Sequence, residues 1–230
     1  MAKLPQRRSS TGEIDKFLTR SNSLVRRETP CGRLIFAIDA TASRQPTWNR
    51  ARQIQGKMFM ATQNLGGLEI QLCYYRGFND FQASSWLQDE LALLQQMNTV
   101  HCEGGYTQIR RVLEHSLREH QKQAVKAVVL IGDACEENHD LLAGKAGELG
   151  IAGLPLFMFQ EGHDRPAETL FRQMAKLSGG AWARFDHSSA TELAELLGAV
   201  ARYAAAGRES LLEYSAGASS GVKLLLEQLK

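Results

Sequence analysis

The chain has 230 residues, 43% of them hydrophobic and 23% charged, and its formal net charge is only +2. This composition is near the average of soluble globular proteins, which excludes a disordered or fibrous chain, and the length suits one domain with appendages. No apolar run approaches the roughly 18 residues that a membrane span needs, and the polar start lacks the apolar stretch of a secretory signal, so we expect a cytoplasmic protein with no membrane partner.

The basic residues gather at the start of the chain. Residues 1–30 hold seven Lys or Arg against three Asp or Glu, and they predict a basic, solvated leader with a short helix over residues 12–27. The rest of the chain is slightly acidic, so we do not expect a nucleic-acid partner. The four cysteines form no CxxC pair and three sit in or beside apolar runs, which indicates reduced thiols without a zinc site.

Apolar runs alternate with segments of helical periodicity from residue 33 onward. The runs predict buried strands over 33–39, 68–75, 125–131 and 154–159, with an edge strand over 182–185. Apolar side chains recurring every three or four positions predict helices over 48–65, 84–97, 109–117, 141–149, 170–177 and 190–206. Because strands alternating with helices imply right-handed crossovers, we expect one α/β domain over residues 31–206, with a three-layer, doubly wound and mainly parallel sheet flanked by helices.

A C-terminal tail over residues 207–230 follows the predicted domain. It contains the small-residue segment SAGASSG and then an apolar run in which helical spacing puts Val222, Leu225, Leu226 and Leu229 on one side. This run predicts a docking helix, and its target is either the surface of the same domain or a second protein.

Polar side chains occupy three of the predicted loops. Asp39, Thr41 and Ser43 come directly after the first strand, Thr107 follows the glycine pair 104–105 at the start of a helix, and Asp133 follows the strand ending at Gly132. Ligands bind beyond the carboxyl ends of the strands of an open parallel sheet, so these side chains are candidates for one common site.

The same residues carry a resemblance to the von Willebrand factor A (VWA) domain family. The metal-ion-dependent adhesion site (MIDAS) of that family reads DxSxS after the first strand, then a Thr before a later helix, then an Asp after the next core strand. Asp39, Thr41, Ser43, Thr107 and Asp133 match this order. The departures are Thr41 in place of the usual Ser, Ala42 where Gly is common, and the unusual neighbours of Asp133.

The resemblance implies an intracellular, non-enzymatic binding module with a divalent cation. The hydroxyls of Thr41, Ser43 and Thr107 would hold Mg²⁺, with Mn²⁺ and Ca²⁺ as alternatives, and Asp39 and Asp133 would act largely through water. In that family the cation takes an Asp or Glu from a protein partner, and intracellular members, bacterial ones among them, tend to act as adaptors.

Alternatives remain at this stage. Asp39 and the pair Gly132 and Asp133 also fit a Mg²⁺-dependent phosphohydrolase of the haloacid dehalogenase type, although position 41 is a Thr where that family has a second Asp. A VWA scaffold with an empty metal site is a third possibility. Glu136 and Glu137 either tune the charge of the site or form the first turn of the next helix.

Overall fold

The structure is a computed structural model that describes residues 31–186 and 190–229, and these residues belong to one compact unit. The predicted leader over residues 1–30, with its helix over 12–27, lies outside the described residues. None of the helices in the described ranges combines the length and the apolar character that crossing a bilayer requires.

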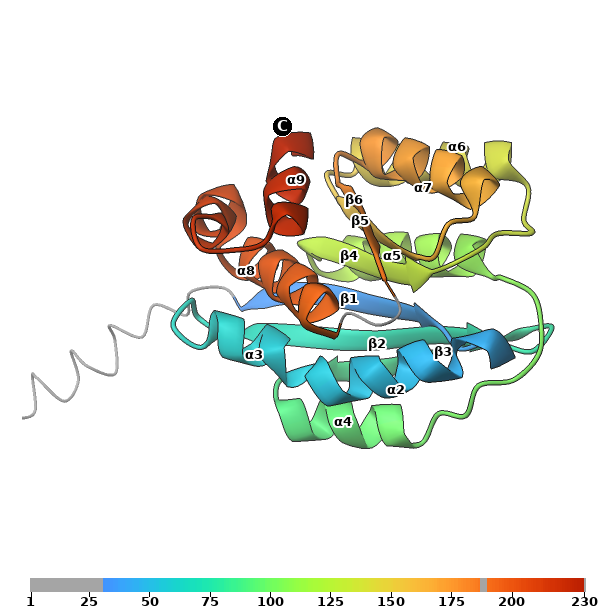
Figure 1. Ribbon diagram of the computed structural model, residues 1–230, viewed down its shortest axis with the longest axis horizontal. Helices are drawn as coiled ribbons and strands as arrows, with labels where there is room; N and C mark the ends of the chain where they lie inside the picture. The colour runs from blue at the N-terminus through green and yellow to red at the C-terminus, as the bar shows by residue number, and fades with distance from the viewer. Residues whose placement is uncertain (1–30, 187–189, 230) are drawn as a thin grey trace, which may run out of the picture. The chain divides into compact units, whose positions relative to one another are not determined.

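A single sheet of six strands forms the centre of this unit (Figure 1). Its order is β3-β2-β1-β4-β5-β6, and all neighbours are parallel except β2 and β3. The strands are β1 (Gly32–Asp39), β2 (Leu68–Arg76), β3 (Asp80–Leu87), β4 (Ala127–Gly132), β5 (Leu156–Glu161) and β6 (Trp182–Phe185). The predicted doubly wound, mainly parallel sheet is therefore confirmed.

Helices cover both faces of the sheet. One face carries α2 (Gln45–Ile54), α3 (Gly56–Thr62), α4 (Glu90–Asn98), α8 (Ala190–Ser215) and α9 (Ser220–Gln228), and the other carries α5 (Ile109–Lys122), α6 (His139–Ile151) and α7 (Arg165–Ser178). Successive side chains of β1 enter the two cores in turn, Phe36 with the first group and Ala37 with the second. A strand buried on both faces must be apolar throughout, which explains the continuous run seen in the sequence.

The segment after β2 differs from the prediction. A helix over residues 84–97 was expected, but residues 80–87 form the antiparallel edge strand β3, and α4 begins only at Glu90. Gly77, at φ 55°, lies in the turn, and the Leu72 N–H donates to the Ser84 hydroxyl across the pair. Pairing with β2 therefore overrides the helical spacing over residues 84–87.

The predicted helix over residues 48–65 is also wrong in one respect, because it is divided into α2 and α3 at Gln55. Beyond residue 206 the chain turns at Gly207, where φ is 80°, and continues in helical conformation to Ser215. Helix α9 then returns to the sheet, where Val222 and Leu225 are buried and the Gln228 amide pairs with both the N–H and the carbonyl of Trp182 on β6.

Candidate metal centre

The carboxyl ends of β1 and β4 are a switch point of the sheet. The two strands are parallel neighbours, with Ile38 paired with Ile131. The helices that follow β1 pack on one face of the sheet, and α6, which follows β4, packs on the other. Because the segments after β1 and β4 lead to opposite faces of the sheet, a crevice opens between their loops. Asp39 and Asp133 lie where these loops begin.

The three loops that the sequence singled out meet in this crevice. They form a cavity of about 200 Å³. Its lining includes all five predicted residues, Asp39, Thr41, Ser43, Thr107 and Asp133, together with Ala42, Gly104, Gly105, Ala134 and Glu136. The structure thus brings the five side chains together, while their role as metal ligands remains a prediction.

Asp39 is the buried anion of the cavity. Only 1% of it is exposed, and its Oδ1 accepts the Thr41 N–H at 2.7 Å. The pKa of Asp39 is raised to about 6, chiefly by burial and in part by the charge of nearby Asp133, while the hydrogen bonds from Thr41 and the charge of Arg44 oppose the rise. A carboxylate held in this way is stabilised by any cation that enters the cavity.

Thr107 is held by a residue whose role the sequence analysis left open. Glu136 Oε2 accepts the Thr107 N–H at 3.1 Å and its hydroxyl at 2.9 Å, and the hydroxyl in turn accepts the Glu136 N–H at 3.2 Å. Since the hydroxyl gives its proton to a carboxylate, its oxygen can turn a lone pair toward a cation. Glu136 therefore orients Thr107.

Glu137 does not belong to the first turn of the next helix. The expectation that Glu136 and Glu137 form that turn is therefore wrong. Helix α6 begins at His139 and is capped by Asn138. Glu137 instead accepts the N–H groups of Ile109 at 2.5 Å and Arg110 at 3.1 Å, at the start of α5. Burial raises the pKa of Glu137, and these hydrogen bonds oppose the rise. The two acids thus tie the β4 loop to the α5 loop.

Arg44, next to Ser43, is a residue that the sequence analysis did not identify. Its Nη2 lies 3.0 Å from Asp133 Oδ2, and its Nη1 lies 2.5 Å from Oε2 of Glu161, which is only 5% exposed and ends β5. Glu161 also accepts the Thr47 hydroxyl. The sequence held one indication of this contact, because Glu161 is the last residue of β5, the parallel neighbour of β4.

The donor set fits a hard divalent cation. The five predicted residues give the cavity three hydroxyls and two carboxylates, and Glu136 adds a third carboxylate. Hard cations such as Mg²⁺ and Ca²⁺ prefer such oxygen ligands. Within residues 31–186 and 190–229, no three His, Cys, Asp or Glu side chains are grouped to hold a metal, so the hydroxyls would be essential to any binding. When bound, the cation would supply a positive charge with an open position for an anionic oxygen.

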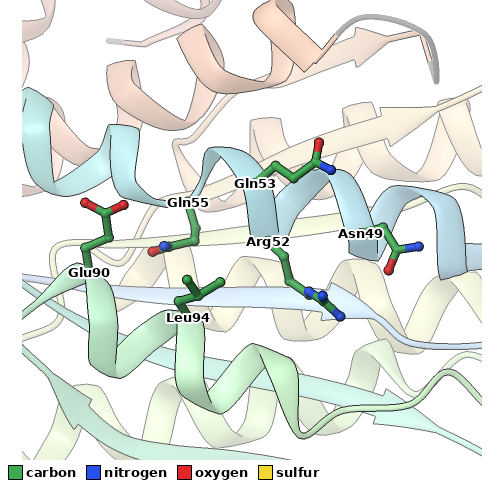
Figure 2. A pocket seen from close by; sticks show the side chains of 6 residues that line it. All are labelled: Asn49, Arg52, Gln53, Gln55, Glu90 and Leu94. Atoms are coloured by element: carbon green, nitrogen blue, oxygen red, sulfur yellow. The ribbon is translucent and has the colours of Figure 1, made fainter.

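A larger hollow of about 470 Å³ lies away from these loops, between α2 and α4 (Figure 2). It is lined by Asn49, Arg52, Gln53, Gln55, Glu90 and Leu94. The Glu90 carboxylate packs against Gly56, and the side-chain amide oxygen of Gln55, Oε1, is buried without a hydrogen-bond partner. Its lining holds a single acid, Glu90, together with the guanidinium of Arg52, whereas the smaller cavity holds three carboxylates.

Comparisons with known proteins identify the fold. No protein-family model matches the sequence, and no curated protein matches it. Among solved structures, a von Willebrand factor type A protein from Catenulispora acidiphila superposes with a TM-score of 0.63 at 17% identity, over 76% of this chain and 42% of that one. The present chain therefore spans less than half of that protein.

Two further structures are similar. An aerotolerance-related membrane protein from Bacteroides fragilis NCTC 9343, with multiple mutations to serines, gives a TM-score of 0.57 at 15% identity, over 72% of this chain and 96% of that one. Proximal thread matrix protein 1 from the mussel byssus, described with a zinc-occupied MIDAS motif, gives 0.60 at 13% identity, over 84% and 53%. The chain has the fold of a VWA-type domain.

Proposed function

We propose that this domain binds a divalent cation in the cavity between β1 and β4 and uses the cation to capture a carboxylate of a protein partner. The observation that carries the proposal is the convergence of three hydroxyls and two carboxylates from three separate loops on one cavity. The oxygen donors favour Mg²⁺, with Mn²⁺ and Ca²⁺ as alternatives, and the zinc-occupied MIDAS motif of the mussel protein is a precedent for a divalent cation in this fold.

The residues have separate tasks in this proposal. The hydroxyls of Thr41, Ser43 and Thr107 coordinate the cation, and Asp39 and Asp133 hold its water ligands. Because most direct ligands are neutral, the cation keeps much of its charge and attracts an Asp or Glu side chain as a further ligand. Ser43 is exposed while Asp39 is buried, so the open position faces solvent.

We propose a binding module, adaptor-like and cytoplasmic, and not an enzyme. A phosphohydrolase of the haloacid dehalogenase type needs a second acid two residues after its nucleophile, and Thr41 at that position cannot transfer a proton near neutral pH. Here the Thr41 N–H is bonded to the very carboxylate that would have to attack. Turnover of a generic phosphate ester that is lost in Asp39→Asn would contradict this assignment.

The test is metal-dependent thermal stabilisation. A cation that binds only the folded chain stabilises it by about 3 kcal/mol at a hundredfold excess over its Kd. We expect Mg²⁺ to raise the melting temperature of the wild type, and we expect Ser43→Ala to abolish the rise. The matched control is Ser85→Ala, since Ser85 is another exposed serine but lies on the edge strand β3. Equal responses of the two variants would mean that the cation does not bind through Ser43.

The domain organisation belongs to the same proposal. We propose a basic leader over residues 1–30 and a binding domain from residue 31, with the segment after residue 206 acting as a tail that docks through α9. The packing of Val222 and Leu225 on the domain supports docking to the chain itself.

A further inference from the structure

Two exposed aromatic side chains contact each other beside the candidate metal centre. Phe78 is 76% exposed and Tyr106 is 60% exposed, and their rings meet edge to face with centroids 5.4 Å apart. Of the aromatic side chains in residues 31–186 and 190–229, these two alone are exposed. Aromatic side chains are enriched at protein interfaces, where they bury a large area at little cost in side-chain entropy. A solvent-exposed aromatic pair therefore points to a binding surface.

The pair adjoins the cavity directly. Tyr106 lies between Gly105 and Thr107, which both line the cavity. Neighbouring Cα atoms are about 3.8 Å apart, so the Tyr106 backbone is one residue from a proposed ligand. Phe78 comes from a different part of the chain, the turn between β2 and β3. Tyr106 of the aromatic pair is therefore carried by the same loop that lines the cavity, one residue from Thr107.

The turn that carries Phe78 is fixed to the loop that carries Tyr106. The Tyr106 N–H donates to the Gly77 carbonyl at 3.2 Å, and the Gln108 side chain donates to the Arg76 carbonyl at 3.0 Å. Gly105 approaches Gly77 so closely that an added Cβ would lie 1.8 Å from the Gly77 carbonyl oxygen.

Arg111 completes the attachment by donating to the backbone carbonyl and to the side chain of Asn79, both at 2.9 Å. The two rings are thus presented in a set position before a partner arrives, and a surface ordered in advance loses less entropy on binding.

We infer that Phe78 and Tyr106 form a subsite for a large apolar side chain of the partner, next to the acid that the cation captures. This inference rests on the proposed function, because the cation in the cavity is what makes the partner residue an acid. An extended chain advances roughly 3.3 to 3.6 Å per residue, so the apolar side chain would lie within about two or three residues of the acid. The partner is a protein segment with an Asp or Glu beside a Leu, Met or aromatic residue.

The test is selection from a random peptide library displayed on phage. The wild-type full chain would be used in Mg²⁺, with elution by chelator, so that only metal-dependent binders are recovered. We expect the recovered peptides to share an acid with a large apolar residue nearby. Selection on Phe78→Ser/Tyr106→Ser should keep the acid and lose the apolar preference, and wild-type peptides should bind this variant about tenfold or more weakly.

The matched control is Ile151→Ser/Leu177→Ser. These two side chains are 91% and 45% exposed and lie at the far ends of α6 and α7, away from the carboxyl ends of the strands. This variant should select the same peptides as the wild type. Melting temperatures of both double variants should match that of the wild type, because exposed side chains contribute little to stability.

The outcomes separate the two proposals. If the acid is recovered without an apolar neighbour, or if Phe78→Ser/Tyr106→Ser selects the same peptides as the wild type, the subsite is refuted and the metal site stands. If no metal-dependent acid is recovered at all, the proposed function fails and the subsite with it. If sedimentation in Mg²⁺ shows a dimer that this variant loses, the rings serve a second copy of the chain, and the inference is overturned.

Discussion

Arg44 and Asp133 form an ion pair across the candidate metal centre, with 3.0 Å between Nη2 and Oδ2. The same guanidinium binds buried Glu161, so a cation of the protein itself stands at the edge of the cavity proposed for a metal ion. A metal ion in the cavity and the Arg44 guanidinium beside it would repel each other. Arg44 should therefore stabilise the metal-free domain and weaken metal binding.

Replacing Arg44 separates these two effects. In Arg44→Gln we expect the metal-free domain to lose about 3 kcal/mol of stability, because buried Glu161 loses the nearer of its two arginine partners and keeps only Arg50 at 3.7 Å. Mg²⁺ should then raise the melting temperature by more than it does in the wild type. The measurement is thermal unfolding with and without Mg²⁺. Arg110→Gln is the control, since Arg110 is 55% exposed in its pair with Glu114; an Mg²⁺ response in Arg44→Gln no larger than in this control would refute the competition.

Glu136 should act on metal affinity through Thr107. Glu136→Gln keeps the size of the side chain but weakens its acceptance of the Thr107 hydroxyl, and residues that orient ligands typically change metal affinity about ten- to a hundredfold. We expect a weaker Kd for Mg²⁺ by at least about tenfold, measured by calorimetry. Glu148→Gln, in an exposed pair with Lys145, is the comparison and should leave the Kd unchanged.

Adjacent glycines differ in what they tolerate. A Cβ on Gly105 would collide with the backbone of Gly77, whereas a Cβ on Gly104 would meet nothing within 4 Å. Gly105→Ala should therefore cost about 2 kcal/mol or more, as overpacking does, and Gly104→Ala should cost little. Chemical denaturation of both variants measures the difference, and equal losses would mean that the two loops separate freely.

His115 should make the domain less stable in acid. Burial lowers the pKa of His115 from its usual 6.5, with Arg118 and Lys122 also lowering it and Glu119 opposing them. The unfolded chain then takes up this proton first, so stability is fully present above pH 6.5 and falls as the pH drops from there toward the folded-state pKa. The imidazole lies 2.8 Å from the Gln71 side chain and against Phe81.

The measurement is the unfolding free energy of the wild type and of His115→Gln near neutral pH and near pH 5. The advantage of the wild type over the variant should shrink in acid. Asp39, whose pKa is raised to about 6, acts in the opposite sense, but it is present in both proteins and cancels in the difference. A difference that stays constant with pH would show that His115 does not contribute.

The sequence predicted the buried strands of the sheet and missed the edge strand β3. Strands such as β1 and β4 are buried on both faces, so their apolar runs are unmistakable. Residues 80–87 instead form an edge strand with mixed burial, and its pairing with β2 depends on contacts that no local pattern contains. The segment thus read as the start of a helix.

The candidate site divides in the same way. Asp39, Thr41, Ser43, Thr107 and Asp133 follow elements whose ends could be located, and the topology of a parallel sheet brings such ends together. Arg44, Glu136 and Glu161 join the site through side-chain contacts. Glu136 is 29 positions from Thr107 in the sequence, and Glu161 is 117 positions from Arg44. Such contacts depend on the direction in which each side chain points. No periodic pattern in a single sequence predicts that direction.

The pairing of Gln228 with Trp182 has a consequence for solubility. An unpaired strand at the border of a sheet offers its peptide groups to the strand of any neighbouring molecule, and natural proteins cover or interrupt such borders. Here one side-chain amide of α9 takes both the N–H and the carbonyl of Trp182 on β6. We expect a version of this protein that ends before Ser220 to keep its sheet and still aggregate, because the edge strand β6 would lose the side chain that covers its peptide groups.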